Sequence, residues 1–494
     1  TNETSRIKKD TDGDGIDDLI ETTLIGVAGA KDPALTPAKA GKFYFVEPYS
    51  FDGSAAPSPT SSLLALSTQL NKGDVGFVVD TTGSMGGEIN NLKSSLSTTI
   101  IPALKTRIPD LGIGVAGEDD YPVNPYGASS WGDRPFYISS GTNGFVTTVT
   151  ATAQTAANAL TTHNGVDWPE SQIPAMYTAL TGATLSWTGG SVVSPAAPAG
   201  TFGALRFRTD ALPILIPITD ASMHEGKRAL NKTATSYDAS FQYVYNSAIT
   251  GKFNADQLVA KINELGAKLI GVSSDDGGRA MGIDDPYGYL AYLADKTNSY
   301  VPPTAFTGGT CKTGVGGATV AADGPLVGTV RQCRNVFSIN TSGTGLGTSI
   351  VDGVFAVLNS IKFDVYVRAI DDTTDAVDAV NAFMTKVEPQ PTGGTDPVTG
   401  SVCEVFSATL LADKYNTPKA LAGAGDIKET ITALNPGKYY CYSVVPKANT
   451  TVPATSVVQT FKASLRVLAD KPTGGTFILG TDREVLFIVP PLIN

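Results

Sequence analysis

Few residues of this 494-residue sequence are charged, and long apolar runs are missing. Charged residues make up 17% of the chain, and there are only two histidines and four cysteines. The most apolar stretches, residues 212–218 and 485–493, are far shorter than the roughly 20 residues that span a bilayer. We therefore expect no transmembrane segment.

The sequence also lacks the motifs of common catalytic sites. It contains no Gly-x-Ser-x-Gly elbow, no His-Glu-x-x-His pair, no Gly-x-x-x-x-Gly-Lys-Ser/Thr loop and no Cys/His zinc cluster. With two histidines, general-base chemistry would have to rest on carboxylates, and the most obvious carboxylates fit metal-binding patterns better. The sequence therefore favours a binding protein over an enzyme.

Clusters of basic residues are missing as well. The formal net charge is -11, whereas phosphate binding needs lysine and arginine gathered on one face. We therefore expect no nucleic-acid partner. An acidic chain of this kind is suited to binding cations.

The four cysteines fall into two locally spaced pairs, which predict the disulfides Cys311–Cys333 and Cys403–Cys441. The alternative is four buried free thiols. Disulfides would indicate an oxidising compartment, and a chain that starts at Thr1 without Met is what removal of an export leader leaves. We therefore expect a secreted protein that is extracellular or attached to the cell surface.

The apolar pattern divides the chain into parts. Residues 1–40 form a polar N-terminal segment. Within residues 41–360, apolar strands at 75–79, 111–116 and 212–218 alternate with helical stretches and Gly/Thr-rich loop insertions. Buried strands that alternate with helices predict an α/β domain with a doubly wound, mostly parallel sheet.

Residues 361–494 show a different pattern of short alternating strands, with one helical stretch at 376–387. This pattern is typical of an immunoglobulin-like β-sandwich. Cys403 and Cys441 could join two of its strands, and Tyr439 precedes Cys441 by the spacing of a tyrosine corner. The predicted fold class is therefore α/β with a C-terminal β-sandwich.

The N-terminal segment contains the ligand spacing of a twelve-residue calcium loop, with a glycine at position six. The predicted Ca²⁺ ligands are Asp10, Asp12, Asp14, Ile16 through its carbonyl oxygen, Asp18 and Glu21. Strong flanking helices are missing, so the loop resembles the Asp-rich calcium loops of secreted bacterial proteins and thrombospondin type 3 repeats. We expect a structural role; the alternative is a solvated acidic turn.

A second metal-binding pattern follows the apolar strand at 75–79. In Asp80-Thr-Thr-Gly-Ser84, a tight loop would turn Asp80, Thr82 and Ser84 toward one point, and Gly83 would let the backbone bend. Their oxygens are ligands suited to Mg²⁺. The pattern resembles the metal-ion-dependent adhesion site (MIDAS) of von Willebrand factor type A (VWA) domains. The alternative is an ordinary helix N-cap turn.

The resemblance is to secreted bacterial VWA proteins of the hemicentin-like subgroup, covers roughly residues 73–358, and implies a VWA/Rossmann-like fold. It implies that Thr82 and Ser84 bind the ion directly and Asp80 through water. It also implies two further loops. The apolar strand that ends in Thr219-Asp220 makes Asp220 the candidate for the distal carboxylate.

The middle loop, residues 163–171, reads His-Asn-Gly-Val-Asp-Trp-Pro-Glu-Ser. The hemicentin-like subgroup has Gly-Gly-Asp-x-Pro-Glu there, which points to Asp167 where most VWA domains carry threonine. The additional negative charge would favour Ca²⁺ or weaken the attraction for an acidic ligand.

Other polar residues stand near these loops in the sequence. His163 and His224 are each four residues from a proposed metal aspartate. Because oxygen-rich Mg²⁺ or Ca²⁺ sites do not favour imidazole, we expect them to hydrogen-bond around the site or to have no role. For Glu118-Asp119-Asp120 we expect a solvated acidic loop; the alternative is an adjacent cation site.

The resemblance implies a metal-dependent extracellular adhesion protein, in which Mg²⁺ or Ca²⁺ completes its coordination with an acidic group of a protein or glycan ligand. The alternative is a structural subunit of a self-assembling filament or surface layer, with metals serving stability and copies of the same chain as partners. The apolar residues 485–493 could add a strand to a neighbour's sheet, although completing their own sandwich is the expected use.

Overall fold

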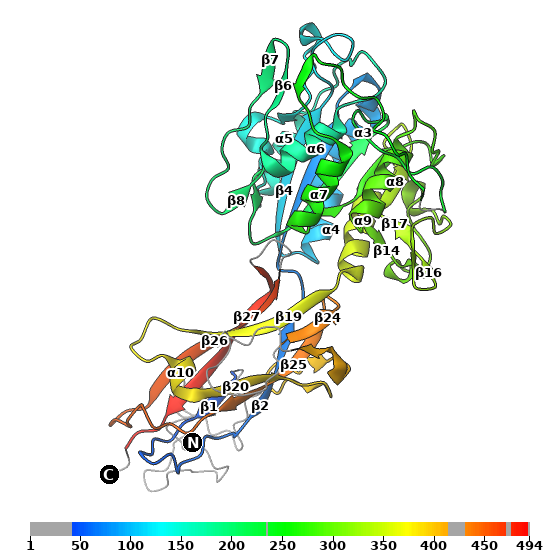
Figure 1. Cartoon of the computed structure of the whole chain (residues 1–494). Coiled ribbons are helices and arrows are strands. Elements are labelled where there is room, and N and C mark those ends of the chain that lie inside the picture. The colour runs from blue at the N-terminus through cyan, green and yellow to red at the C-terminus, as the bar shows by residue number, and fades with distance from the viewer. Residues whose placement is uncertain (1–41, 234–235, 413–429, 471–475, 493–494) are drawn as a thin grey trace. The chain divides into compact units, whose positions relative to one another are not determined.

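The structure is a computed structural model that describes residues 42–233, 236–412, 430–470 and 476–492 (Figure 1). The predicted N-terminal segment, residues 1–40, lies outside these ranges. The same is therefore true of its predicted calcium ligands, Asp10, Asp12, Asp14, Ile16, Asp18 and Glu21.

The chain divides into two compact units. Unit 1 contains the described residues of Thr1–Gln69, Lys362–Asp470 and Ile478–Asn494, and unit 2 contains those of Leu70–Ile361 and Lys471–Phe477. The predicted boundary between residues 360 and 361 lies beside the observed one. The predicted start of the middle domain at residue 41 differs from the observed start at Leu70, because the preceding strands belong to the sheets of unit 1.

Unit 2 is built on a seven-stranded sheet in the order β18-β13-β10-β3-β4-β5, with β12 also beside β10. All pairs are parallel except β4 with β5. The strands are β3 Lys72–Asp80, β4 Asp110–Glu118, β5 Tyr137–Ile138, β10 Leu212–Thr219, β12 Lys268–Leu269, β13 Gly271–Ser274 and β18 Val336–Ile339.

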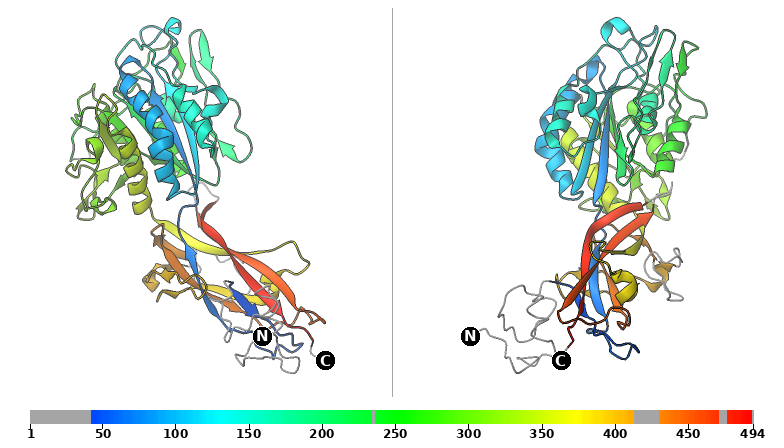
Figure 2. Two further views of the ribbon diagram at one scale, coloured as in Figure 1. Left: turned by 180° about the vertical axis from the view of Figure 1, so that it is seen from behind. Right: turned by 90° about the vertical axis from the view of Figure 1, so that its left-hand side faces the viewer.

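The central strands of this sheet are apolar because helices pack on both faces (Figure 2). All eight residues of β10 are buried, as expected for a strand covered on both sides. One layer contains α6 Gln172–Thr181, α7 Ala255–Leu265 and α8 Pro286–Lys296. The other contains α3 Gly86–Ser95, α4 Ile101–Lys105, α5 Thr150–Asn158 and α9 Leu346–Ser360.

Small antiparallel sheets interrupt the chain between these elements. The pairs are β6 Leu185–Trp187 with β7 Gly190–Val192 and with β11 Ile249–Gly251, β8 Thr201–Phe202 with β9 Phe207–Arg208, β14 Tyr300–Val301 with β17 Cys333–Arg334, and β15 Leu326–Val327 with β16 Val330–Arg331. The predicted disulfide Cys311–Cys333 is confirmed, with the two Cα atoms 5.5 Å apart.

Unit 1 is formed by β-sheets and a short helix. Its sheets have the orders β1-β27-β26-β19-β24-β23, β2-β25-β20 and β21-β22. The elements are β1 Tyr44–Val46, β2 Ser62–Ser67, β19 Phe363–Asp371, α10 Ala379–Phe383, β20 Met384–Pro389, β21 Gly394–Thr395, β22 Val402–Cys403, β23 Leu411–Ala412, β24 Thr430–Leu434, β25 Tyr439–Pro446, β26 Gln459–Asp470 and β27 Thr476–Val489. The predicted disulfide Cys403–Cys441 joins β22 to β25 and is confirmed.

The apolar C-terminal strand completes its own sheet. β27 lies between β1 and β26, so both of its edges are paired within unit 1. Its partner β1 comes from the other end of the described chain, which explains why residues 42–69 belong to this unit. None of the described helices is both long and apolar enough to cross a bilayer.

The predicted fold class is wrong as a description of the chain. We expected α/β with a doubly wound, mostly parallel sheet and a C-terminal immunoglobulin-like sandwich, but strand outweighs helix, at 33% against 23%. Apart from the β1–β27 pair, parallel pairing is confined to one sheet, and the other sheets are small or antiparallel. The Gly/Thr-rich insertions close into hairpins, and the β-unit draws strands from both ends of the described chain.

Glu47 is a buried acid in unit 1 whose carboxylate has no hydrogen-bond partner. It follows β1, is 0% exposed, and both of its side-chain oxygens lack a donor among the described residues. Burial raises the pKa of Glu47 to about 9. The folded protein therefore keeps this group protonated at pH 7, whereas the unfolded chain releases the proton above its ordinary pKa of 4.5.

We predict that the free energy of unfolding of unit 1 falls as pH rises from about 4.5 to about 9 and then levels off. Between pH 4.5 and pH 7, Glu47 lowers the free energy of unfolding by at most about 3 kcal/mol, because each pH unit costs about 1.36 kcal/mol. Glu47→Met should raise stability at pH 7 and flatten this decline, as measured by denaturant unfolding at several pH values. Glu484→Gln, at an exposed position of β27, is the control; equal pH profiles for both variants would contradict the prediction.

Candidate metal centre

The carboxyl ends of three neighbouring strands of unit 2 bring acidic and hydroxyl side chains together. Asp80 ends β3, Glu118 ends β4 and Thr219 ends β10. The parallel register places Asp80 beside Glu118, and Ile218 beside Val79. The loops that follow these strands therefore begin at one edge of the sheet, where ligand sites of parallel sheets form.

Four hydrogen bonds fix the carboxylate of Asp80, which is fully buried. Its Oδ1 accepts from the backbone N of Thr82 at 2.9 Å and from Thr82 Oγ1 at 2.7 Å. Its Oδ2 accepts from Thr219 Oγ1 at 2.8 Å and from Gln172 Nε2 at 3.2 Å. Asp80 therefore orients the Thr82 hydroxyl and joins the loop to β10 and α6.

The loop after β3 does not act as an ordinary helix cap. Thr82 precedes the short 3-10 helix Gly83–Met85, yet its side chain makes no capping bond, and the start of α3 is also uncapped. The Thr82 hydroxyl turns to Asp80, and Ser84 hydrogen-bonds with the carboxylate of Asp220. The side chains of this loop therefore face the site and do not cap the helix.

Backbone hydrogen bonds hold the middle loop over the other two loops. The N of His163 donates to the carbonyl oxygen of Thr81 at 2.7 Å, and the N of Glu170 donates to the carbonyl oxygen of Ser222 at 2.9 Å. Gly165 has a φ of +68°, and a Cβ atom there would lie 3.0 Å from Glu170 Oε1. Glycine suits both this left-handed backbone conformation and the close approach of Glu170.

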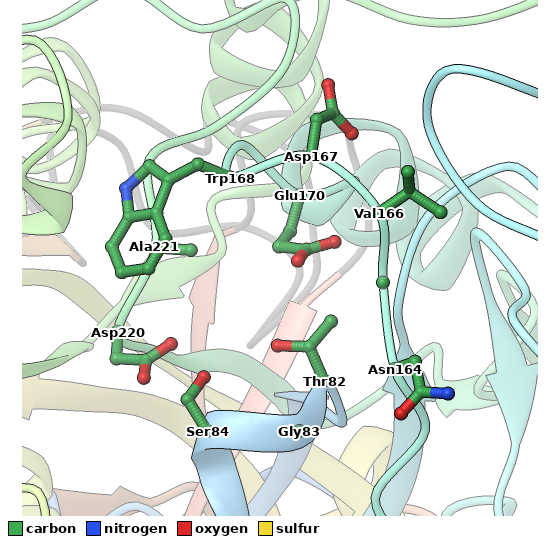
Figure 3. A pocket seen from close by; sticks show the side chains of 11 residues that line it. Thr82, Gly83, Ser84, Asn164, Val166, Asp167, Trp168, Glu170, Asp220 and Ala221 are labelled. Carbon is green, nitrogen blue, oxygen red and sulfur yellow. The ribbon is translucent and has the colours of Figure 1, made fainter.

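The three loops enclose a cavity of about 160 Å³. This is smaller than the roughly 300–1,000 Å³ of drug-sized ligand pockets, and it suits an ion with a few small ligands. The cavity is lined by Thr82, Gly83, Ser84, Asn164, Gly165, Val166, Asp167, Trp168, Glu170, Asp220 and Ala221 (Figure 3).

The structure brings four of the five predicted MIDAS residues together. Asp80 hydrogen-bonds with Thr82, and Thr82, Ser84 and Asp220 line the same cavity, where Figure 3 shows Ser84 and Asp220 facing each other. Asp167 lines the cavity, but its carboxylate points away from Thr82 and Ser84 in Figure 3 and lies 3.1 Å from His224 Nε2.

Glu170 is the acidic residue that sequence reasoning missed. Its carboxylate lies between Asp167 and Thr82 in Figure 3, and it is buried, at 4% exposed. The signal was present, because Glu170 is the last residue of the Asp-x-Pro-Glu string that pointed to Asp167. Gln172 and Thr219, which hold Asp80, carried no comparable signal.

The acidic stretch after β4 is not the solvated loop that we expected. Glu118, Asp119 and Asp120 are all fully buried. Asp119 lies 2.9 Å from the Nδ1 atom of His163, and Asp120 lies 3.2 Å from the Nε2 atom of His224. Both histidines therefore contact carboxylates around the cavity, in line with the expected hydrogen bonding.

Burial raises the pKa values of the acidic side chains around the cavity. Burial, followed by the nearby charge of Asp220, raises the pKa of Asp80 to about 7. Burial also raises the pKa of Asp220, and it raises those of Glu118 and Glu170 well above their usual range. Nearby negative charges add to the effect at Glu118 and Glu170.

The donor set fits a divalent cation. Two buried oxygens in the site, Glu170 Oε2 and Asp220 Oδ1, have no hydrogen-bond partner among the described residues. Hydroxyl and carboxylate oxygens are ligands that Mg²⁺ and Ca²⁺ prefer. A cation would satisfy these oxygens and offset the repulsion between the acids.

Comparisons with known proteins do not identify the chain. No protein-family model matches it, and no curated protein matches its sequence. Two crystal structures of the pilus adhesin SpaC from Lactobacillus rhamnosus GG were found, one in the open conformation, with TM-scores of 0.29 and 0.31 and identities of 10% and 9%. They cover 85% and 86% of this chain, which spans 46% of theirs. A likeness at this level carries no functional argument.

We predict that Glu170→Gln stabilises unit 2 in cation-free buffer at pH 7, because burial raises the pKa of Glu170 and folding therefore opposes its ionisation, whereas the amide does not ionise in either state. The same change should reduce the stabilisation that added Mg²⁺ or Ca²⁺ provides. Thermal unfolding with chelator and with each cation measures both effects. Glu264→Gln, on the exposed side of α7, is the control, and an unchanged cation effect in Glu170→Gln would refute the prediction.

Proposed function

We propose that this chain is an extracellular adhesion protein whose cavity in unit 2 is a MIDAS-type metal site. The observation that carries the proposal is the convergence of Thr82, Ser84, Glu170 and Asp220 on one small cavity, with buried oxygens that lack hydrogen-bond donors. Such a set of oxygens is what a divalent cation requires.

Ser84, Thr82 and Asp220 would hold the ion, and Asp80 would orient them through its hydrogen bonds to Thr82 and β10. The bound Mg²⁺ or Ca²⁺ would supply positive charge to an acidic group of a protein or glycan ligand. Glu170 would add negative charge beside the ion, so the net attraction for such a group depends on how far the cation and Glu170 offset each other.

The rim of the cavity offers apolar contact for a ligand. Val166 and Trp168 line the cavity and are 49% and 53% exposed. The Nε1 of Trp168 donates to the carbonyl oxygen of Asp284 at 2.8 Å, which holds the indole ring in place. A fixed, exposed tryptophan beside a charged site is typical of residues that dominate binding energy.

The surroundings of the cavity support binding over catalysis. His163 contacts Asp119, and His224 contacts Asp120 and Asp167. Ser84 hydrogen-bonds with Asp220 and not with a histidine. We therefore infer that Ser84 is a metal ligand in this site and not a nucleophile activated by a histidine base. Two confirmed disulfides agree with an oxidising, extracellular location.

The apolar C-terminal strand does not supply the strand addition that a self-assembling filament could use. β27, which includes most of the apolar residues 485–493, is paired on both edges within its own unit. It is therefore not available to complete a neighbour's sheet.

We predict that Ser84→Ala abolishes cation-dependent ligand binding while leaving the fold intact, because it removes a direct ligand at an exposed position. The full chain, immobilised on beads, should retain probes from arrays of extracellular-matrix proteins and acidic glycans in Mg²⁺ or Ca²⁺ and release them in chelator.

The matched control is Ser94→Ala, which removes an exposed hydroxyl from α3 that bonds only to the carbonyl oxygen of Asn91. It should retain probes like the unchanged chain. Retention that survives chelator, or that Ser84→Ala leaves intact, would refute a metal-dependent adhesion function.

A further inference from the structure

A second group of potential ligands lies beside the cavity. Asp120 follows β4, Asp167 is in the middle loop, and His224 follows β10. One ligand atom from each residue lies within 4.8 Å of the other two. Asp120 and His224 are buried, whereas the Asp167 side chain is 30% exposed.

The hydrogen bonding of His224 places its Nε2 atom toward the two carboxylates. Its Nδ1 contacts the backbone carbonyl oxygen of Tyr243, which can only accept a hydrogen bond, so Nδ1 carries a proton. In the neutral ring the free lone pair is then on Nε2, which faces Asp120 and Asp167. An Nδ1–H bound to a backbone carbonyl is the usual support of a histidine that ligates metal through Nε2.

Aromatic rings and hydrogen bonds fix the orientation of both buried residues. The His224 ring stacks on Tyr245 with centroids 4.1 Å apart and meets the edge of Tyr126 at 5.1 Å. Asp120 Oδ1 accepts from the Tyr245 hydroxyl at 2.6 Å and from the backbone N of Tyr121. These contacts leave Asp120 Oδ2 directed at His224.

A single proton on His224 would not satisfy both acids. Nε2 lies 3.1 Å from Asp167 Oδ2, with hydrogen-bond geometry, and 3.2 Å from Asp120 Oδ2. Asp120 Oδ2 is fully buried and has no hydrogen-bond donor among the described residues. Bonds of about 2.0 Å to a shared ion would separate neighbouring ligand atoms by about 3.0–3.3 Å, which agrees with both distances.

We propose that Asp120, Asp167 and His224 bind a divalent transition-metal ion. The imidazole ligand favours Zn²⁺ over Mg²⁺ and Ca²⁺, whose sites consist of oxygens. This site is separate from the proposed MIDAS-type site, which contains no histidine. The partial exposure of Asp167 leaves the ion open to solvent on the side of the cavity, where a water molecule or a ligand group can complete its coordination.

Zinc titration of the full chain by calorimetry, in excess Mg²⁺ and Ca²⁺, tests this site. We expect one Zn²⁺ ion that these cations do not displace, with imidazole scattering in the zinc X-ray absorption spectrum. His224→Gln and Asp167→Asn should each weaken Zn²⁺ binding by at least about tenfold. Asp167→Asn changes a partly exposed side chain, so the test does not depend on whether the buried His224→Gln variant folds.

Two control variants show whether the bound Zn²⁺ belongs to these three residues. His163→Gln changes the only other histidine, which contacts Asp119, and should leave Zn²⁺ binding unchanged. Ser84→Ala should also leave it unchanged, so the second site can stand or fall independently of the adhesion function. The proposal is overturned if the chain binds no Zn²⁺, if Asp167→Asn binds it as tightly as the unchanged chain, or if the absorption spectrum shows no imidazole.

Discussion

The alignment of β3 with its parallel neighbours β4 and β10 is the constraint on which the rest of the site depends. It places Asp80, Glu118 and Thr219 at one edge of the sheet, although they are far apart in the sequence. The hydrogen bond from Thr219 Oγ1 to Asp80 Oδ2 joins two of these strand ends directly. Every loop of the cavity begins at one of these strand ends or is hydrogen-bonded to a loop that does, so a shift in register would separate the proposed ligands.

A buried carboxylate lies near each end of β3, and only one of the two has a basic partner in the described part of the chain. Asp74, near the beginning of the strand, is fully buried but is paired with Arg208, whose Nε lies 2.8 Å from its Oδ1. Asp80, at the other end, is equally buried, and the described residues supply it with no arginine or lysine. Because burying charge without compensation is costly, the carboxyl end of the sheet is where an external cation contributes most. The buried acids without a basic partner are therefore gathered at one end of the sheet, where the proposed cation would lie.

Sequence reasoning identified residues that lie close together where short-range patterns carried the information, and it failed where long-range packing determines the structure. The Asp-x-Thr-x-Ser spacing and the apolar run before Asp220 predicted residues that the structure brings together. Asp167 and Glu170 stand in the same loop, and only the backbone bonds of Glu170 to the loop after β10 determine which carboxylate faces Thr82. The fold class failed for a similar reason, since β1 pairs with β27 from the far end of the chain.

The middle loop explains how one cluster of acids could hold two different ions. Gly165 lets Glu170 approach the hydroxyl-lined side, while Asp167, three residues earlier, turns to the imidazole of His224. The first group offers only oxygens and the second offers nitrogen as well, so their preferences among metals differ. The loop would therefore give the two sites different sets of ligand atoms without any change in backbone conformation.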